Sequence, residues 1–217
     1  MQLRGYCVRE NFRLPIDCEL CKTALATAFE REVRNNLQEY RNDARLRSVL
    51  DDIAVWLVNS QTTWGLMIGG IPGTGKTTIL TALQRVINTL QLKDPLVSTS
   101  TDIRQAGLCI VTAKDICSKF MESQTNYRKF RETSLLALDD LGNEPSEIIS
   151  YGNLLTPIED LLEYRYQRRL FTVITTNISP KQIRSNYGDR IASRFNEMMY
   201  VVNMPPHSFR EPQDGAI

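Results

Sequence analysis

The sequence has few of the residues from which metal centres and disulfide frameworks are built. Only one histidine, His207, occurs among the 217 residues, and the five cysteines (positions 7, 18, 21, 109 and 117) are odd in number and show no disulfide pattern. Cys109 and Cys117 lie in apolar surroundings, which is typical of reduced core thiols. Cys18 and Cys21 have the spacing of half a zinc site, but no second pair accompanies them. We therefore favour a helix that begins with two thiols over a zinc site.

Long apolar runs are also absent. No stretch of about 18 apolar residues occurs, so we expect no membrane span and no membrane partner. The first residues, Met1 to Gly5, lack the apolar segment of a signal peptide, and we predict a cytoplasmic protein. The 26 basic and 25 acidic residues nearly cancel. This balance excludes neither nucleic acid nor protein partners, because local patches decide such binding.

The clearest motif is the stretch GIPGTGKT at 70–77, which fits the pattern G-x-x-x-x-G-K-[ST]. An apolar strand is expected before it at 64–69 and an amphipathic helix after it at 76–91, so the context predicts a phosphate-binding P-loop. Glycines let backbone N–H groups close around phosphate oxygens, and the helix directs its positive dipole end at the same anion. We expect the nucleotide to contact Gly70, Pro72, Gly73, Thr74, Gly75, Lys76, Thr77 and Thr78.

Within this loop, Lys76 is placed to reach the β- and γ-phosphates of a nucleoside triphosphate, and the Thr77 hydroxyl to bind Mg²⁺. A second motif, SLLALDDLG at 134–142, is an apolar strand that ends in two acids. Such a strand presents carboxylates at the sheet edge where ligands bind. Asp139 is expected to hold Mg²⁺ and Asp140 to activate the attacking water as a catalytic base. The alternative is that both acids only cap the next turn.

A third motif, Thr-Thr-Asn at 175–177, follows another apolar strand. We interpret Asn177 as a catalytic amide that contacts the γ-phosphate and the lytic water, while a helix-capping role before Pro180 is the compatible alternative. Arg190 and Arg194 then share one helix face at i and i+4. They either pair with local acids or neutralise a phosphate on another molecule.

The remaining pattern predicts an α/β fold. Strands are expected at 64–69, 107–112, 134–139 and 170–175, and helices at 76–91, 113–122, 153–168 and 180–198. Such alternation predicts a parallel sheet with helices on both faces, here a P-loop NTPase sheet. We divide the chain into a helical extension (1–60) and a nucleotide-binding domain (61–217). Two helices, beginning near Asp17 and Asp43, either pack on that domain, which we favour, or present a face to a partner.

Taken in order, these motifs resemble those of the AAA+ ATPases of the initiator and helicase-loader group, and within it the DnaC-type helicase loaders and IstB-type transposition helpers. The resemblance covers roughly residues 60–210: Walker A at 70–77, Walker B at 135–142, sensor I at 175–180 and the arginine-finger segment GDRIASRF at 188–195. It implies ATP and Mg²⁺ as ligands. It further implies that Arg194 is the finger that reaches a neighbour's ATP, that Arg190 supports it, and that Arg210 makes a sensor II-like contact in cis.

The sequence departs from the family pattern at two places. Many relatives have Glu where this chain has Asp140, and the shorter side chain predicts slow hydrolysis. The sequence ends soon after Arg210, so we expect little or no C-terminal lid domain. The acid pair, the Thr-Thr-Asn step and the paired arginines nevertheless favour an ATPase over a small-molecule kinase.

Partners are implied by the same resemblance. A finger supplied in trans requires self-association in a head-to-tail ring or filament. The stretch NYRKFR at 126–131 interleaves aromatic and basic residues, and Arg165, Arg168 and Arg169 form a second basic cluster. Both fit DNA, with single strands favoured, as well as they fit a solvated helix face. Three functions stay open, in this order: loading a replicative helicase on single-stranded DNA, assisting a transposase on duplex DNA, and an ATP-gated scaffold without useful turnover.

Overall fold

The chain forms a five-stranded parallel sheet in the order β2-β3-β6-β1-β7. A computed structural model describes residues 11–59, 62–94, 96, 102–145, 148–150 and 153–209. The strands are β1 (Gly65–Gly69), β2 (Leu108–Thr112), β3 (Leu135–Leu141), β6 (Phe171–Thr176) and β7 (Met199–Asn203). Every neighbouring pair is parallel, for example Gly69 beside Thr176 and Thr112 beside Asp139. The predicted parallel sheet is therefore confirmed.

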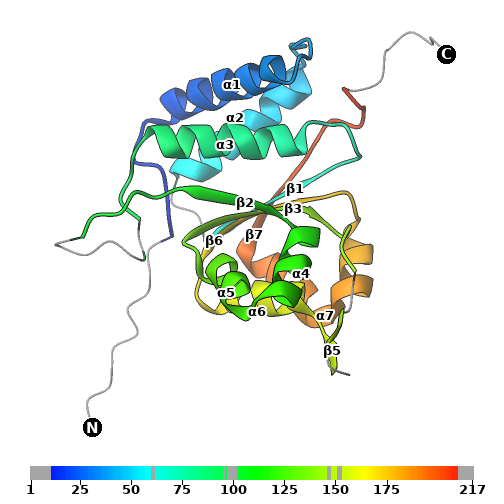
Figure 1. Ribbon diagram of the computed structural model, residues 1–217. Coiled ribbons are helices and arrows are strands. Elements are labelled where there is room, and N and C mark those ends of the chain that lie inside the picture. The colour runs from blue at the N-terminus through cyan, green and yellow to red at the C-terminus, as the bar shows by residue number, and fades with distance from the viewer. Residues whose placement is uncertain are drawn as a thin grey trace.

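Helices cover both faces of this sheet (Figure 1). On one face lie α1 (Cys18–Asn35), α2 (Ala44–Val58) and α3 (Lys76–Thr89); on the other lie α4 (Ala113–Glu122), α5 (Gln124–Glu132), α6 (Pro157–Gln167) and α7 (Pro180–Met198). Two hydrophobic clusters fill the two interfaces. A short antiparallel pair, β4 (Ile148–Ser150) and β5 (Asn153–Leu155), precedes α6. Strands β1, β2, β3 and β6 carry the unbroken apolar runs that predicted them, as expected of strands covered on both faces. Strand β7 was not predicted; it is less apolar, and Val201 is exposed.

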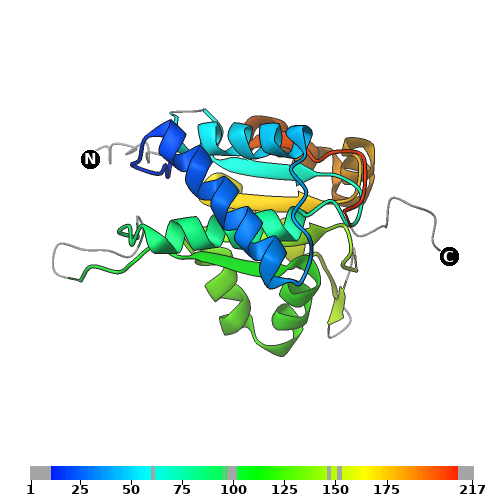
Figure 2. The same cartoon turned by 90° about the horizontal axis from the view of Figure 1, so that it is seen from above.

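The N-terminal helices share their core with the sheet. The Asp17 carboxylate caps α1 by accepting the N–H groups of Glu19 and Leu20, and Asp43 caps α2 by accepting that of Leu46. The apolar stripes of both helices join α3 and the strands in one cluster, and Figure 2 shows the three helices over one face of the sheet. Of the two roles foreseen for these apolar faces, the observed one is packing against α3 and the sheet.

The last helix, α7, contains a break. Ser179 caps it through a reciprocal pair of bonds with Gln182, so its start is well defined. At Gly188 the backbone leaves helical geometry (φ 79°, ψ 167°), a conformation that glycine adopts without strain. A Cβ placed there would meet nothing within 4 Å, so backbone geometry and not space selects glycine. The break separates the start of α7 from the part that carries Arg190 and Arg194.

The cysteine pair lies in the first turn of α1, as the helix interpretation predicted. Cys21 is fully buried, and this burial, together with nearby Cys18, raises the pKa of its thiol to about 11. A thiol that stays protonated is a poor zinc ligand. Among the described residues no group of three or more His, Cys, Asp or Glu could hold a metal ion, and Cys7 lies outside them. No helix in the described part of the chain is long and apolar enough to span a bilayer.

Arg165 is completely buried, whereas the sequence pattern placed it in a basic surface cluster with Arg168 and Arg169. Its guanidinium donates hydrogen bonds to the Thr172 hydroxyl (2.9 Å) and to the carbonyl oxygens of Arg131 (3.1 Å), Thr133 (2.8 Å) and Phe171 (2.6 Å). Burial lowers the pKa of Arg165 to about 9, so the group is still protonated at neutral pH. Arg165 thus links α6 to β6 and to the end of α5 by hydrogen bonds. Its assignment to a DNA-binding surface is wrong.

We expect Arg165→Met to destabilise the fold by about 2–4 kcal/mol, because it leaves three buried carbonyl oxygens without their donors. Urea denaturation followed by circular dichroism measures the change. Arg168→Met is the matched control: Arg168 is exposed on the same helix end, and its loss should cost less than about 0.5 kcal/mol. Equal stability of the two variants would contradict the structural role of Arg165.

Candidate functional site

The P-loop joins the end of β1 to the start of α3. Gly73 and Gly75 have φ values of 83° and 89°, in the region that favours glycine, and α3 begins directly after Gly75. Thr74 is buried, and its hydroxyl donates to the Ile71 carbonyl (3.0 Å), which braces the loop from within. The first N–H groups of α3 therefore face the space that the loop encloses, as an anion site requires.

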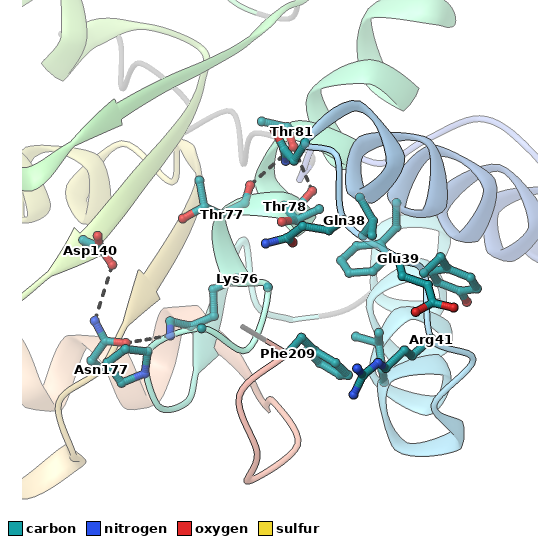
Figure 3. A pocket seen from close by; sticks show the side chains of 18 of the residues that line it. Gln38, Glu39, Arg41, Lys76, Thr77, Thr78, Thr81, Asp140, Asn177 and Phe209 are labelled. Atoms are coloured by element: carbon teal, nitrogen blue, oxygen red, sulfur yellow. Dashed lines mark hydrogen bonds between the residues drawn. The ribbon is translucent and has the colours of Figure 1, made fainter. Parts of the chain in front are cut away.

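Lys76 places its ammonium in this loop. The side chain is buried, and Nζ donates to the carbonyl oxygens of Gly70 (2.8 Å) and Ile71 (2.9 Å) and to Oδ1 of Asn177 (2.6 Å) (Figure 3). The contact with Asn177 joins residues 101 positions apart in the sequence. A cation held beside a glycine-rich loop and a helix N-terminus fits a polyphosphate by charge and by shape.

Thr77 and Asp139 form the second part of the site. The Thr77 hydroxyl donates to Oδ2 of Asp139 (2.9 Å), and the Thr175 hydroxyl donates to the other carboxylate oxygen. Asp139 is buried, so both of its oxygens are fixed by these bonds. Hydroxyl and carboxylate oxygens are the ligands that Mg²⁺ takes in proteins. The residues present thus fit the predicted magnesium site, and Thr175 is a supporting residue whose role the sequence did not reveal.

Asp140 is turned into the site by its backbone. Its φ of 56° is left-handed, the register of β3 shifts between Leu138 and Leu141, and its N–H donates to the Thr175 hydroxyl (2.8 Å). Asn177 Nδ2 donates to Oδ1 of Asp140 (3.4 Å), so the amide links this carboxylate to Lys76 (Figure 3). Because Ser179 caps α7, Asn177 is not its cap. The two acids and the amide foreseen from the sequence therefore meet at one sheet edge.

Lys76, Thr77, Asp140 and Asn177 line one end of a pocket of about 640 Å³. Its other end is formed by residues that sequence reasoning did not assign to the nucleotide: Phe29, Val33, Asn36, Gln38, Glu39, Tyr40, Arg41, Leu46 and Phe209. Figure 3 shows Gln38, Glu39, Arg41 and Phe209 across the cavity from Lys76 and Asn177. The backbone N–H of Phe209 donates to the Gly73 carbonyl (3.0 Å), which fixes the C-terminal segment against the P-loop. The pocket thus has a polar end at the P-loop and a partly apolar end.

The two predicted arginines lie elsewhere. Neither Arg190 nor Arg194 lines the pocket of its own chain; both pair with Glu163 on α6. Arg194 has only 16% of its side chain exposed, whereas Arg190 has 66%. Of the two roles left open for this pair, local pairing with an acid is therefore observed. Arg210, the expected sensor II-like contact, lies outside the described residues.

The aromatic and basic stretch at 126–131 also differs from its prediction. It forms most of α5, with Tyr127 buried and its hydroxyl donating to the Pro157 carbonyl (2.8 Å). Burial raises the pKa of Tyr127. A ring in the core has no free face for a nucleic acid base, so the stacking role of Tyr127 is wrong. Arg128 and Lys129 remain exposed on this helix.

Comparison with known proteins gives a fold and no sequence relative. No protein-family model matches the chain, and no curated protein sequence matches it. Among solved structures, the DnaC helicase loader is similar with 23% identity over 81% of this chain and 99% of its own (TM-score 0.55). DnaI is similar with 18% identity over 93% and 97% (TM-score 0.56). The replication initiator DnaA, bound to AMPPCP and single-stranded DNA, is similar with 20% identity over 76% of this chain and 47% of its own (TM-score 0.50), so this chain spans about half of DnaA.

At these identities the comparisons establish the architecture. The chain has the fold of the P-loop AAA+ proteins, with a five-stranded parallel sheet between two helical layers. The resemblance to DnaC-type loaders that the motifs indicated is confirmed in the fold, because DnaC and DnaI align over almost their whole length.

Proposed function

We propose that this protein binds ATP with Mg²⁺, hydrolyses it, and uses the nucleotide state to load or remodel a replicative helicase on single-stranded DNA. The observation that carries the proposal is that Lys76, Thr77, Asp140 and Asn177 line one end of the pocket, while buried Asp139 accepts the hydroxyl hydrogen bond of Thr77. These side chains come from three strand ends far apart in the sequence. A chance P-loop pattern would not be expected to bring all of them together.

Each residue has a task in this mechanism. The P-loop N–H groups and Lys76 bind the β- and γ-phosphates, and Thr77 with Asp139 would hold Mg²⁺. When bound, that ion neutralises charge on the phosphate oxygens. Asp140 orients the attacking water and accepts its proton. Asn177 contacts both Asp140 and the γ-phosphate and so fixes their relative positions. The short reach of Asp140 is consistent with slow turnover.

The proposed site is completed by a second copy. Arg194 of one protomer extends to the γ-phosphate held by its neighbour, with Arg190 as a supporting residue on the same helix. Head-to-tail contacts of this kind generate rings or filaments. Arg194 lies outside its own pocket, which agrees with action in trans. We keep Arg210 as a proposed contact to the same phosphate in cis, and the cytoplasmic location remains a prediction.

The DNA and helicase part of the proposal follows proteins of the same fold. DnaC is a helicase loader, and a DnaA structure holds single-stranded DNA together with AMPPCP. Fluorescence anisotropy with single- and double-stranded DNA, at two salt concentrations and with ATP, tests it. We expect tighter binding to single strands and an affinity that falls with salt. A preference for duplex DNA would favour the transposition-helper alternative, and an absent salt slope would contradict DNA binding.

The scaffold alternative differs in its response to Asp140→Asn. We expect this variant to bind ATP normally but to lose at least about a hundredfold in turnover, because an amide cannot accept the proton of the attacking water. Phosphate release measured at saturating ATP decides the question. Unchanged turnover would favour an ATP-gated scaffold over an ATPase.

Phe209 should decide how well the apolar end of the pocket holds the base. Phe209→Ala removes a ring from this end but leaves the backbone bond to Gly73, so we expect ATP and ADP to bind about 5- to 30-fold more weakly, and by similar factors. Calorimetric titration of both nucleotides measures the change, with Phe209→Leu as the control that keeps apolar bulk. A loss confined to ATP would contradict a base-binding role, because the base is common to both ligands.

A further inference from the structure

Two arginines on α7 compete for one carboxylate on α6. Arg194 Nη2 lies 3.1 Å from Oε1 of Glu163, and Arg190 Nη2 contacts the same oxygen atom. Glu163 is itself 24% exposed, so the shared contact is partly shielded from water. Shielding strengthens the attraction between opposite charges. Gln167 Nε2 also donates to this oxygen (3.2 Å), so three donors share an atom with two lone pairs.

Arg194 is held on other sides as well. Its guanidinium carbon lies 4.9 Å from the centroid of the Tyr166 ring, and the Tyr166 hydroxyl donates to Glu197. Atom Nη1 of Arg194 is buried and has no hydrogen-bond partner in the structure. A guanidinium that is stacked, paired through one nitrogen and unsatisfied at the other is retained at some cost. Such a side chain is poised to leave when a better anion is offered.

We propose that Glu163 restrains Arg194 within its own protomer and releases it to the nucleotide of a neighbour, with Arg190 keeping the vacated carboxylate paired. The proposal rests on the proposed function, in which Arg194 completes the adjacent site. Released from Glu163, Arg194 exchanges a single carboxylate contact for a polyphosphate of higher charge. In an isolated protomer Arg194 thus stays paired with Glu163, and assembly around ATP releases it.

Arg190 makes the exchange feasible. A buried carboxylate left without a cation is strongly unfavourable, and removing one partner of a shielded pair is usually costly for that reason. Since Arg190 already contacts the same oxygen, Glu163 stays paired after Arg194 departs. Arg190 is 66% exposed and can adjust its position without repacking the core.

The test is Glu163→Gln, which keeps the shape of the side chain and removes its charge. Turnover per protomer is measured against protein concentration at saturating ATP, for the wild type and the variant. We expect Glu163→Gln to lower the concentration of half-maximal turnover by at least about threefold, because a neutral amide holds a guanidinium less tightly than a carboxylate does. Affinity of the protomer for ATP should not change. Glu163→Asp, which keeps the charge but shortens the reach, should shift the midpoint in the same direction.

Controls separate the restraint from general effects. Glu122→Gln removes a charge from a surface pair with Lys119 on α4 and should leave the midpoint unchanged. If Arg194→Ala abolishes turnover but Glu163→Gln leaves the midpoint where it was or raises it, the restraint is overturned and the shared site stands. If Arg194→Ala leaves turnover intact, the shared site itself fails, and the restraint fails with it.

Discussion

Lys76→Ala is expected to abolish ATP binding, with a loss of affinity of at least about a hundredfold. The ammonium lies against the carbonyl oxygens of the glycine-rich loop, and charge-assisted hydrogen bonds from such a group to phosphate oxygens are strong. Calorimetric titration with ATP and Mg²⁺ measures the loss. Turnover should fall to the background of the assay at every concentration tested.

The control for this variant concerns folding. Lys76 also ties the carbonyl oxygens of Gly70 and Ile71 to Asn177, so its removal loosens the loop as well as the ligand contacts. Thermal melting without nucleotide separates the two effects, and Lys119→Ala serves as a matched substitution at an exposed lysine on the other face of the sheet. ATP affinity close to that of the wild type in a folded Lys76→Ala protein would contradict the phosphate site.

Arg194→Ala is expected to reduce turnover by about 10³- to 10⁵-fold while leaving ATP affinity of the protomer intact, because the arginine acts on the nucleotide of another copy. An equal mixture of Arg194→Ala and Lys76→Ala proteins should then regain activity. An active site in the mixture needs Lys76 from one variant and Arg194 from its neighbour. With random assembly this occurs at about a quarter of the interfaces, so we expect about a quarter of the wild-type turnover per protomer.

This mixing experiment discriminates sharply because neither variant alone contains a complete site. Circular dichroism and size-exclusion chromatography should show that both variants are folded and that both assemble with ATP or with each other. Activity proportional to the sum of the separate variants would contradict completion between copies. Full activity of Arg194→Ala alone would mean that Arg194 serves only in the local ion pair with Glu163.

The approach of Lys76, Asp139, Asp140 and Asn177 to one another could be predicted from sequence because each of the motifs that carry them is local. The glycine-rich loop, the acids after β3 and the amide after β6 each follow a buried strand, and parallel strands bring their carboxyl ends to one edge. The strand pattern alone therefore explains why Lys76, Asp139 and Asn177 lie close together.

The apolar end could not be predicted in the same way. Phe29, Tyr40 and Phe209 come from segments separated by up to 180 positions, and no spacing relates a turn after α1 to the C-terminal segment. Their approach depends on how α1 packs over α3 and on the bond between Phe209 and Gly73. Such contacts follow from tertiary packing and leave no periodic signal.

Other differences have identifiable causes. Strand β7 was not predicted. It begins at Met199, immediately after α7 ends at Met198, so no glycine or proline marks the boundary in the sequence. Helix α5 buries only Tyr127, and its many polar residues were interpreted as a basic surface. Arg165 occupies a core position of α6 that an aliphatic residue normally takes, because four oxygen acceptors surround its guanidinium.

The most direct test of a site shared between two copies is the turnover of the wild-type protein per protomer, measured over a thousandfold range of protein concentration at saturating ATP. We predict a rate near the assay background at the lowest concentrations and a cooperative rise to a plateau as protomers assemble. A rate per protomer that is constant across the whole range, with a monomeric species at each concentration, would contradict it.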